Sequence, residues 1–307
     1  LYINYEPSWD EFHSESENIY RLGQNFRSQE YSLSSFDGFY GASREVQLNQ
    51  IQGFENTRGV RDVAHFWIFG GPSYLNINDR QYTQDGLLTT NTPDAFFKLF
   101  DWEFRYGSAE NFASTTGRAV VTESAARKIS GSNTGALSKL VGQTMTIDST
   151  SYEIAGIIQD IPSNSHYEFE VALHDPKIEY WGGRTYALLD EEADAQEVKQ
   201  RFDKNVANIN PRLASEDELF KGFAIHNLED IHLQANALYE IKPPGSILYI
   251  YVFVIIGLII LLITFTNYTN LSVAMYSGRN REIGIRKVLG AGRSQVAGQF
   301  LIESLLL

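Results

Sequence analysis

One apolar stretch, Ser246–Phe265, constrains this chain more than any other feature, because its 20 residues include no charged residue and no proline. At about 1.5 Å of rise per residue, a helix of this length spans about 30 Å, the hydrocarbon thickness of a bilayer. The alternative is a buried helix of a soluble core, but such helices rarely run so long without a polar face. The stretch therefore predicts a membrane-spanning helix that continues past Phe265 towards Met275.

The charges on the two sides of this stretch differ in sign. Residues 1–245 contain 20 basic and 36 acidic residues, whereas residues 279–307 contain five basic and two acidic ones. Basic residues next to a membrane helix mark its cytoplasmic side, so we expect residues 1–245 to lie outside the cytoplasm. The net charge of −13 argues against nucleic acid as a partner, because binding to phosphates needs clustered lysine and arginine.

Three helices are predicted in the acidic part of the chain. The sequence Ser-Trp-Asp-Glu at residues 8–11 is a capping box, which predicts that a helix begins at Ser8. A second helix is expected over Asp190–Asn208, where apolar residues recur at helical spacing. A third is expected over Glu123–Ile129, with Thr122 as its N-cap.

Strand signals lie between these helices. Gln143–Ile147 and Ser151–Gln159 flank a polar turn at Asp148–Thr150 and predict a hairpin. His166–Leu173 alternates polar and apolar residues, which predicts a half-buried strand. Helices and strands together indicate an α+β domain of one or two subdomains, with a strand-rich part near residues 80–175.

The acidic part carries no recognisable catalytic or metal-binding motif. Phosphate-binding loops, hydrolase elbows, zinc-protease motifs and EF-hands are all missing from the sequence. Because the chain has no cysteine, disulfides, cysteine-ligated zinc and thiol nucleophiles are excluded. His226 and His232 flank Glu229 and Asp230, but ordinary surface or strand histidines are the simpler interpretation. We therefore expect no metal, no cofactor and no catalytic residue.

The segment after the apolar stretch combines a short apolar stripe with basic residues. Ile285, Val288 and Leu289 fall at positions i, i+3 and i+4 of a predicted helix, and Gly290 fits its C-terminal cap. Ser294 is expected to cap a further helix that enters the membrane again. The pattern alone fits two interpretations equally: a basic amphipathic stretch lying on anionic lipid, and a helix that docks into a cytosolic partner.

A resemblance decides between them. The run from Arg281 to Leu307, REIGIRKVLGAGRSQVAGQFLIESLLL, resembles the FtsX/MacB-like permease family of ABC transporters. Members of that family carry a version of E-[IV]-G-[IV]-R-K-[VA]-[LV]-G-A at this place. The acidic part is similar to the MacB-like periplasmic core at residues 8–21, 119–143 and 157–162.

The resemblance implies a non-catalytic permease subunit with four membrane helices, of which this chain holds the second and the start of the third. A cytosolic ABC ATPase and a second permease copy or homologue are the implied partners, in the lipid of a bacterial inner membrane. ATP hydrolysis would move the periplasmic domain by mechanotransmission. The expected polar contacts to the ATPase are Glu282, Arg286 and Lys287, the apolar contacts are Ile283, Ile285, Val288 and Leu289, and the backbone is shaped by Gly284, Gly290 and Gly292.

The expected organisation follows directly. Residues 1–245 form the extracytoplasmic MacB-like α+β domain, 246–276 the transmembrane helix, 277–294 the cytoplasmic coupling segment and 295–307 the start of the next helix. The main alternative is a membrane-anchored extracytoplasmic sensor, which predicts a cytoplasmic effector domain downstream. A membrane-tethered hydrolase is a further alternative, which predicts catalytic groups that converge in the acidic part.

Overall fold

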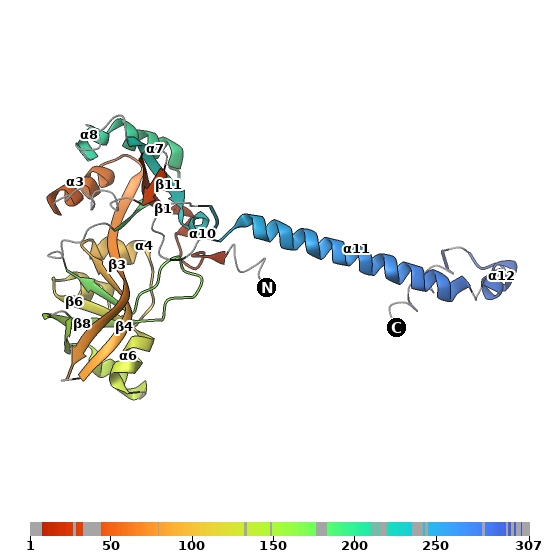
Figure 1. Ribbon diagram of the computed structural model, residues 1–307, viewed down its shortest axis with the longest axis horizontal. Helices are drawn as coiled ribbons and strands as arrows, with labels where there is room; N and C mark the ends of the chain where they lie inside the picture. The colour runs from red at the N-terminus through yellow and green to blue at the C-terminus, as the bar shows by residue number, and fades with distance from the viewer. Residues whose placement is uncertain are drawn as a thin grey trace. The chain divides into compact units, whose positions relative to one another are not determined.

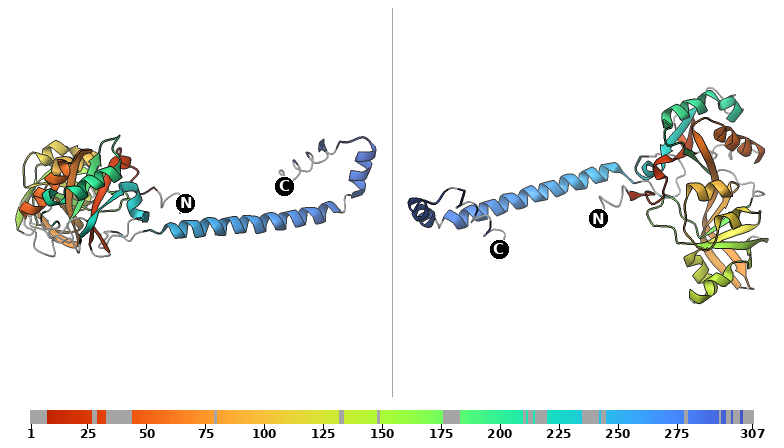
Figure 2. Two further views of the ribbon diagram at one scale, coloured as in Figure 1. Left: turned by 90° about the horizontal axis from the view of Figure 1, so that it is seen from above. Right: turned by 180° about the vertical axis from the view of Figure 1, so that it is seen from behind.

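The computed structural model describes residues 8–26, 29–32, 44–78, 80–131, 134–147, 149–175, 183–209, 220–234, 245–277 and 280–292, with the single positions 211, 214, 242, 294, 295, 298 and 302. The chain divides into two compact units. We call Leu1–Ile247 the globular unit and Leu248–Leu307 the helical unit. Figures 1 and 2 show that the globular unit consists of a mixed β-sheet with helices and that the helical unit contains one long helix.

One mixed sheet of 11 strands organises the globular unit. Its strands are β1 (Ile19–Phe26), β2 (Gln29–Ser32), β3 (Val60–Ile77), β4 (Arg80–Thr90), β5 (Phe104–Gly107), β6 (Arg118–Thr122), β7 (Thr144–Ile147), β8 (Thr150–Ile158), β9 (Val171–His174), β10 (Arg184–Leu189) and β11 (Phe220–Asn227). Their order is β11-β1-β10-β3-β4-β9-β6-β8-β5, while β2 pairs with β1, and β7 pairs with β3 and β8. The β4–β9 and β6–β8 pairs are parallel, whereas the other pairs are antiparallel.

The described residues of the globular unit also form short helices. They are η2 (Ser16–Asn18), α3 (Arg44–Glu55), α4 (Pro93–Leu99), α5 (Ala109–Ala113), α6 (Glu123–Ser130), η3 (Thr134–Leu140), α7 (Ala195–Lys204), α8 (Val206–Ile209), η4 (Leu228–Asp230) and α10 (Ile231–Gln234). Figure 1 shows α3, α7 and α8 at one end of the unit and α6 at the other. The α+β class expected for this part of the chain is confirmed.

The long strand β3 connects three apolar clusters of the globular unit. Near its start, Val63 packs with α3, α7 and β11, and near its end Leu75 packs with α6, β7 and β8. Between these, Phe66 stacks on Tyr186 of β10 and meets Phe96 of α4 edge to face. Because β3 reaches all three clusters, the two ends of the unit share one continuous sheet and are not separate domains.

Several local predictions are confirmed. Thr122 caps α6 as expected, and its hydroxyl accepts a hydrogen bond from the Ala125 N–H at 3.3 Å. The predicted hairpin is β7–β8, with antiparallel pairs from Thr144↔Glu153 to Ile147↔Thr150. Each of these signals depends on residues close in sequence, which explains why they could be read locally.

Three other predictions are wrong in detail. No α-helix begins at Ser8: residues 9–15 form turns and a bend, and Asp10 has a φ of 59°, which a right-handed helix does not allow. The predicted helix over Asp190–Asn208 begins only at Ala195, because the carboxylate of Asp194 caps it by accepting from the N–H groups of Gln196 and Glu197.

The third correction concerns the strand predicted over His166–Leu173. The strand β9 begins only at Val171, and all four of its residues are buried, so it is not half-exposed. The reason is that the His166 N–H donates to the Asp10 carboxylate and not to a neighbouring strand. Tyr167 and Phe169 are nevertheless buried, as their apolar character predicts.

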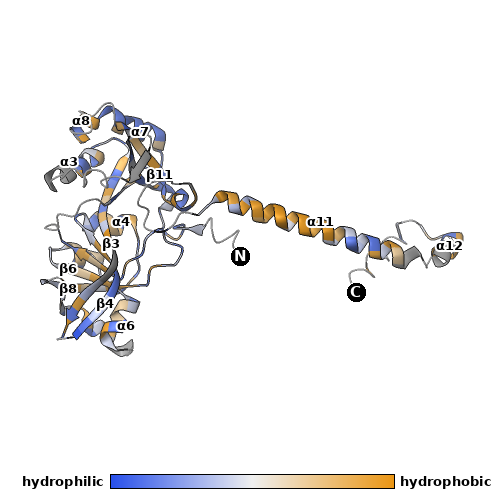
Figure 3. Ribbon diagram, in the orientation of Figure 1, coloured by the Kyte–Doolittle hydropathy of each residue, from blue (hydrophilic) through white to orange (hydrophobic). Residues whose placement is uncertain are grey.

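The helical unit contains α11 (Ile247–Ser277) and α12 (Asn280–Val288). Residues Ile247–Ala274 are long and apolar enough to cross a membrane, and none of that stretch is buried against the rest of the chain. Figure 3 shows α11 mostly apolar along its length, with polar residues towards its C-terminal part. A core helix of a soluble protein would be covered, so the exposed apolar surface supports the membrane interpretation.

Candidate coupling segment

The helix α12 contains most of the residues expected to contact an ATPase. It runs over Asn280–Val288, and Arg286 and Lys287 lie in its last turn, where their positive charge complements the carbonyl end of the helix dipole. Ile285 is 55% exposed, Val288 88% and Leu289 80%. The predicted apolar stripe is therefore open to solvent within the described part of the chain.

Gly290 ends this helix as predicted. It has a φ of +95°, which favours glycine. Its N–H donates to the carbonyl of Lys287 at 3.1 Å, and the N–H of Ala291 donates to the carbonyl of Arg286 at 3.0 Å. This pair of bonds is a Schellman motif, which satisfies the last carbonyls and fixes the direction of the chain after α12.

The residues after Gly290 turn towards a new helix. The Gly292 N–H donates to the side-chain carbonyl of Gln295 at 3.1 Å, and the Gln295 N–H donates to the Gly292 carbonyl at 3.2 Å. The bond from the Gly292 N–H to the Gln295 side chain corresponds to one half of a capping box with Gly292 at the N-cap, and a backbone carbonyl takes the place of the other half. Ser294 already lies within the helical turn, so it is not the N-cap that the sequence predicted.

The remaining predicted contacts also lie on or near α12. Ile283 and Arg286 are half-buried, whereas Gly284 and Lys287 are exposed. The backbone of Glu282 belongs to α12, but its side chain lies outside the described residues. The structure thus gathers the predicted site residues on one helix and the turn that follows it, while their role stays a prediction.

The described residues of the globular unit include two His–Asp pairs that sequence reasoning missed. His13 Nδ1 lies 3.0 Å from Asp101 Oδ1, and this hydrogen bond, together with bonds from Ser14, lowers the pKa of Asp101 to about 2. His166 Nδ1 lies 2.8 Å from Asp10 Oδ2. The partners are 88 and 156 residues apart in sequence, so no local motif announces either pair.

A polar pocket of about 630 Å³ lies at the end of the unit that carries α7. Arg58, Arg61 and Arg201 line it together with the acidic run at residues 190–194. Much of this charge is already paired, since Arg61 binds Glu15 and Arg201 binds Glu197. The pocket lining contains no serine, threonine or histidine, and no group of three potential metal ligands occurs among the described residues.

Comparison with known families places both units. The family model of the MacB-like periplasmic core domain matches residues 10–205, which is more than half of the chain. The model of the FtsX-like permease C-terminal domain matches residues 254–307, including all of α12. No curated protein matches the chain significantly.

Solved structures of low sequence identity share the fold of the globular unit. The chain is similar to a domain of a putative permease protein from Porphyromonas gingivalis, with 15% identity and a TM-score of 0.54 over 71% of this chain and 92% of that one. It is also similar to the periplasmic region of MacB from Actinobacillus actinomycetemcomitans, with 12% identity and a TM-score of 0.49 over 70% and 91% of the two chains. The first similarity supports the fold assignment.

Proposed function

Because the chain belongs to the FtsX/MacB-like family of ABC transporter permeases, we propose that it is the non-catalytic permease subunit that couples ATP hydrolysis by a partner ATPase to movement of its globular unit. It is a membrane protein with an extracytoplasmic MacB-like domain followed by an apolar helix. In the proposed arrangement residues 1–245 lie in the periplasm and residues 246–276 span the inner membrane. Residues 277–294 bind the ATPase in the cytoplasm, and residues 295–307 begin the next helix.

The observation that carries this proposal is the solvent-exposed stripe on α12. Ile285, Val288 and Leu289 expose more than half of their surface, which is costly for large aliphatic side chains unless a partner covers them. Arg286 and Lys287 flank the stripe. The surface that fits this helix is an apolar groove with an acidic rim on the ATPase, a helix-in-groove contact.

The polar residues in the second half of α11 support a second permease copy as a further partner. The hydroxyls of Thr264, Thr266 and Thr269 donate to carbonyls four residues earlier, each at 2.8 Å, and are satisfied within the helix. Asn267 and Asn270 lie three residues apart on one face, and amide side chains in a bilayer favour packing against another helix.

Affinity capture from native membranes tests the proposal. We expect a P-loop ATPase to be recovered with the wild-type protein and its recovery to fall at least about tenfold with Ile285→Asp, because a carboxylate would be buried in an apolar groove. Tyr106→Asp is the matched control: it places the same charge at an exposed apolar residue of β5 (39% exposed). Its ATPase recovery should equal that of the wild type.

Two results would contradict the proposal. Equal ATPase recovery with Ile285→Asp and wild type would show that α12 is not the docking helix. No ATPase with the wild-type protein, and none fused to it, would make the membrane-anchored sensor the better interpretation.

A further inference from the structure

The first described segment of the globular unit, which precedes β1, contains several buried residues although it forms no α-helix or strand. We call residues 8–18 the entry segment and residues 163–168 the rim loop. The described residues 228–234, 242, 245 and 246, which precede α11 in sequence, are called the exit segment. In the entry segment, Trp9, Asp10 and His13 are each at most 8% exposed. Side chains, and not a strand ladder, therefore attach this segment to the rest of the unit.

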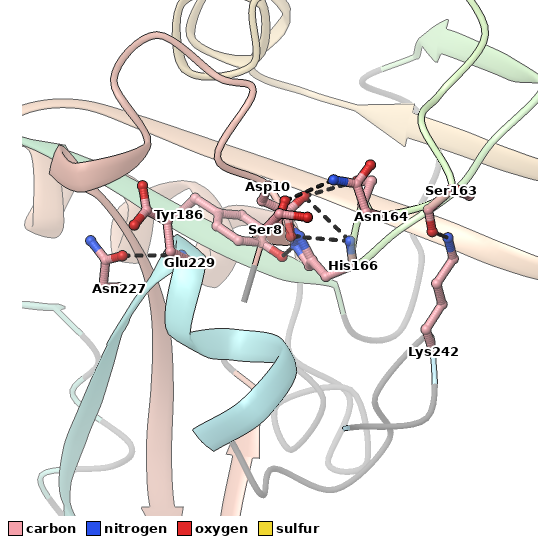
Figure 4. Close-up of polar contacts among 10 residues, drawn as sticks. Ser8, Asp10, Ser163, Asn164, His166, Tyr186, Asn227, Glu229 and Lys242 are labelled. Carbon is pink, nitrogen blue, oxygen red and sulfur yellow. Dashed lines mark hydrogen bonds and ion pairs between the residues drawn. The ribbon is translucent and has the colours of Figure 1, made fainter. Parts of the chain in front are cut away.

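Asp10 attaches the entry segment to the rim loop. It is fully buried, and both of its carboxylate oxygens are used. Oδ1 accepts from the Ser165 hydroxyl at 3.0 Å, and Oδ2 accepts from the His166 N–H at 3.1 Å and faces His166 Nδ1 at 2.8 Å (Figure 4). Backbone bonds reinforce the contact: the Asp10 N–H donates to the Asn164 carbonyl at 3.0 Å, and the Asn164 amide donates to the Ser8 carbonyl at 2.7 Å.

His166 extends this contact into the core. Its Nε2 lies 2.5 Å from the hydroxyl of Tyr186 on β10, and the Tyr186 ring stacks on Phe66 at the middle of the sheet. An Asp–His–Tyr chain resembles catalytic relays, but Asp10 and Tyr186 are fully buried and His166 is 6% exposed. Because all three groups are buried, these hydrogen bonds attach the entry segment to the core of the sheet.

Trp9, the neighbour of Asp10, faces the exit segment. Its ring stacks on His232 with centroids 3.6 Å apart, and the Lys242 ammonium lies 5.5 Å from the ring centroid. Lys242 also reaches the rim loop, donating to the Ser163 carbonyl at 3.4 Å (Figure 4). Asp10 has a positive φ of 59°, a conformation that aspartate tolerates better than most residues. At this position Trp9 contacts the exit segment, whereas its neighbour Asp10 contacts the rim loop.

We propose that Trp9 and Asp10 form a two-sided clasp that holds the exit segment and the rim loop together, and that Asp10, His166 and Tyr186 are positioning residues for the coupling described above. The second half of this statement rests on the proposed function. By chain continuity, the exit segment is the last part of the globular unit before α11. Through the clasp, packed and hydrogen-bonded side chains connect that segment to the centre of the sheet, so a displacement of the segment can be transmitted there.

Loss of one hydrogen-bonding partner is expected to destabilise the clasp strongly. A buried carboxylate is tolerated only when its lone pairs are satisfied, so removing one donor leaves an uncompensated group in the core. Asp10→Asn is the most informative change, because both oxygens of Asp10 face donors. An asparagine keeps one acceptor oxygen where aspartate offers two to Ser165 and His166, and it removes the negative charge that faces His166 Nδ1.

Asp194→Asn is the matched control. A single oxygen of Asp194, Oδ1, accepts from both the Gln196 and Glu197 N–H groups, at 2.8 and 2.9 Å. The carbonyl of an asparagine can accept both of these bonds, and asparagine caps helices about as well as aspartate. The same substitution is thus disruptive at Asp10 and nearly neutral at Asp194.

Amide hydrogen exchange of the chain in detergent, without any ATPase, tests the clasp. Asp10→Asn should accelerate exchange in the entry segment, the rim loop and residues 228–234 by about tenfold or more, while α7 and β8 keep their wild-type rates. Asp194→Asn should leave all of these segments unchanged. If Asp10→Asn fails to fold, Tyr186→Phe, which removes only a hydroxyl, should accelerate exchange in the rim loop and entry segment. Wild-type rates in either folded Asp10→Asn or Tyr186→Phe would overturn the clasp.

A reversible covalent clasp tests the positioning role. Because the chain has no cysteine, the pair Asp10→Cys and Ser165→Cys can be reduced or oxidised selectively, at a place where the wild-type side chains are 3.0 Å apart. In complex with the ATPase, the reduced variant should lose the ATP-dependent change in exchange of the globular unit while ATPase activity stays within about twofold. Oxidation should restore that change. Wild-type exchange rates of α7 and β8 in the reduced variant, measured without ATP, would show that a general loss of stability is not the cause of the lost response.

The outcomes separate the two proposals. An ATP-dependent change that persists in the reduced variant would overturn the positioning role and leave the proposed function standing. No ATP-dependent change in the wild-type complex would overturn both the proposed function and the positioning role. The clasp itself would then be judged by the exchange experiment alone.

Discussion

At the scale of single residues, His65 shows how burial sets a pH dependence. It is buried on β3, its Nδ1 lies 2.9 Å from the Thr185 hydroxyl, and its carbonyl accepts from Thr90 at 2.9 Å. Burial, and secondly the nearby Arg184 guanidinium, lower the pKa of His65 from 6.5 to about 4. The imidazole is therefore neutral in the folded chain at pH values where it would be protonated in the unfolded one.

We predict that this histidine destabilises the globular unit as the pH falls. Because the folded pKa of His65 lies below its unfolded pKa, the loss of stability begins near pH 6.5 and is complete near pH 4. The whole loss is on the order of 3 kcal/mol. His65→Asn keeps a hydrogen-bonding group near Nδ1 but cannot titrate. The difference in free energy of unfolding between wild type and variant should therefore shrink between pH 7 and pH 4.

Urea unfolding followed by tryptophan fluorescence measures this difference. All four tryptophans of the sequence, Trp9, Trp67, Trp102 and Trp181, precede the apolar stretch, so the signal of the 307-residue chain in detergent reports on the globular unit. A difference that stays constant from pH 7 to pH 4 would refute the assignment to His65.

At the scale of elements, α12 depends on one glycine for its end and tolerates replacement of another. Gly290 has a φ of +95°, whereas Gly284 lies inside the helix, and a methyl group added there would meet no heavy atom within 4 Å. An alanine at position 290 is strained by about 1 kcal/mol or more. An alanine at position 284 favours the helix by about 0.5–1 kcal/mol.

We therefore predict opposite effects of one substitution at two places in α12. Gly290→Ala should reduce capture of the ATPase roughly five- to tenfold, because the Schellman motif that orients the stripe is weakened. Gly284→Ala should leave capture equal to the wild type or raise it. Unfolding of the globular unit should be unchanged in both variants, and equal capture by both would show that the end of α12 does not matter for docking.

A second element, α11, gives a prediction for oligomerisation. Asn267→Leu combined with Asn270→Leu should lower the fraction of dimer in nanodiscs at least about threefold. The reason is that hydrogen bonds from amide side chains between helices in a bilayer contribute about 0.6–2 kcal/mol. Thr264→Val is the control, since that hydroxyl already bonds to the Ile260 carbonyl within its own helix. Energy transfer between labelled copies provides the measurement; unchanged transfer in the asparagine variant would argue against this face as the contact.

The same scale explains what sequence reasoning could and could not find. The Thr122 cap, the turn at Ser149 and the end of α12 at Gly290 follow from interactions within a few residues, so they were predicted. The capping box at Ser8 was overridden because the carboxylate of Asp10 binds Ser165 and His166, 155 and 156 residues away. The late start of β9 has the same cause. Buried pairs between distant segments leave no period or spacing in the sequence.

At the scale of the whole molecule, the distribution of charge makes the topology testable. The acidic residues before α11 and the basic residues after it predict that α12 lies in the cytoplasm. Moving that basic segment through the bilayer is unfavourable, because each arginine or lysine costs about 2.5–3.5 kcal/mol at the centre of a membrane helix. The globular unit and α12 should therefore be accessible from opposite sides of the membrane.

Single cysteines in this cysteine-free chain test that topology. Tyr106→Cys on β5 and Val288→Cys on α12 both replace exposed apolar residues, which are 39% and 88% exposed. We expect a membrane-impermeant maleimide to label Tyr106→Cys in cells whose outer membrane has been opened, and to label Val288→Cys only after the inner membrane is permeabilised as well. Labelling of Val288→Cys before that step would place α12 outside the cytoplasm. It would thereby remove the docking of a cytosolic ATPase on α12, whereas the buried clasp would be unaffected.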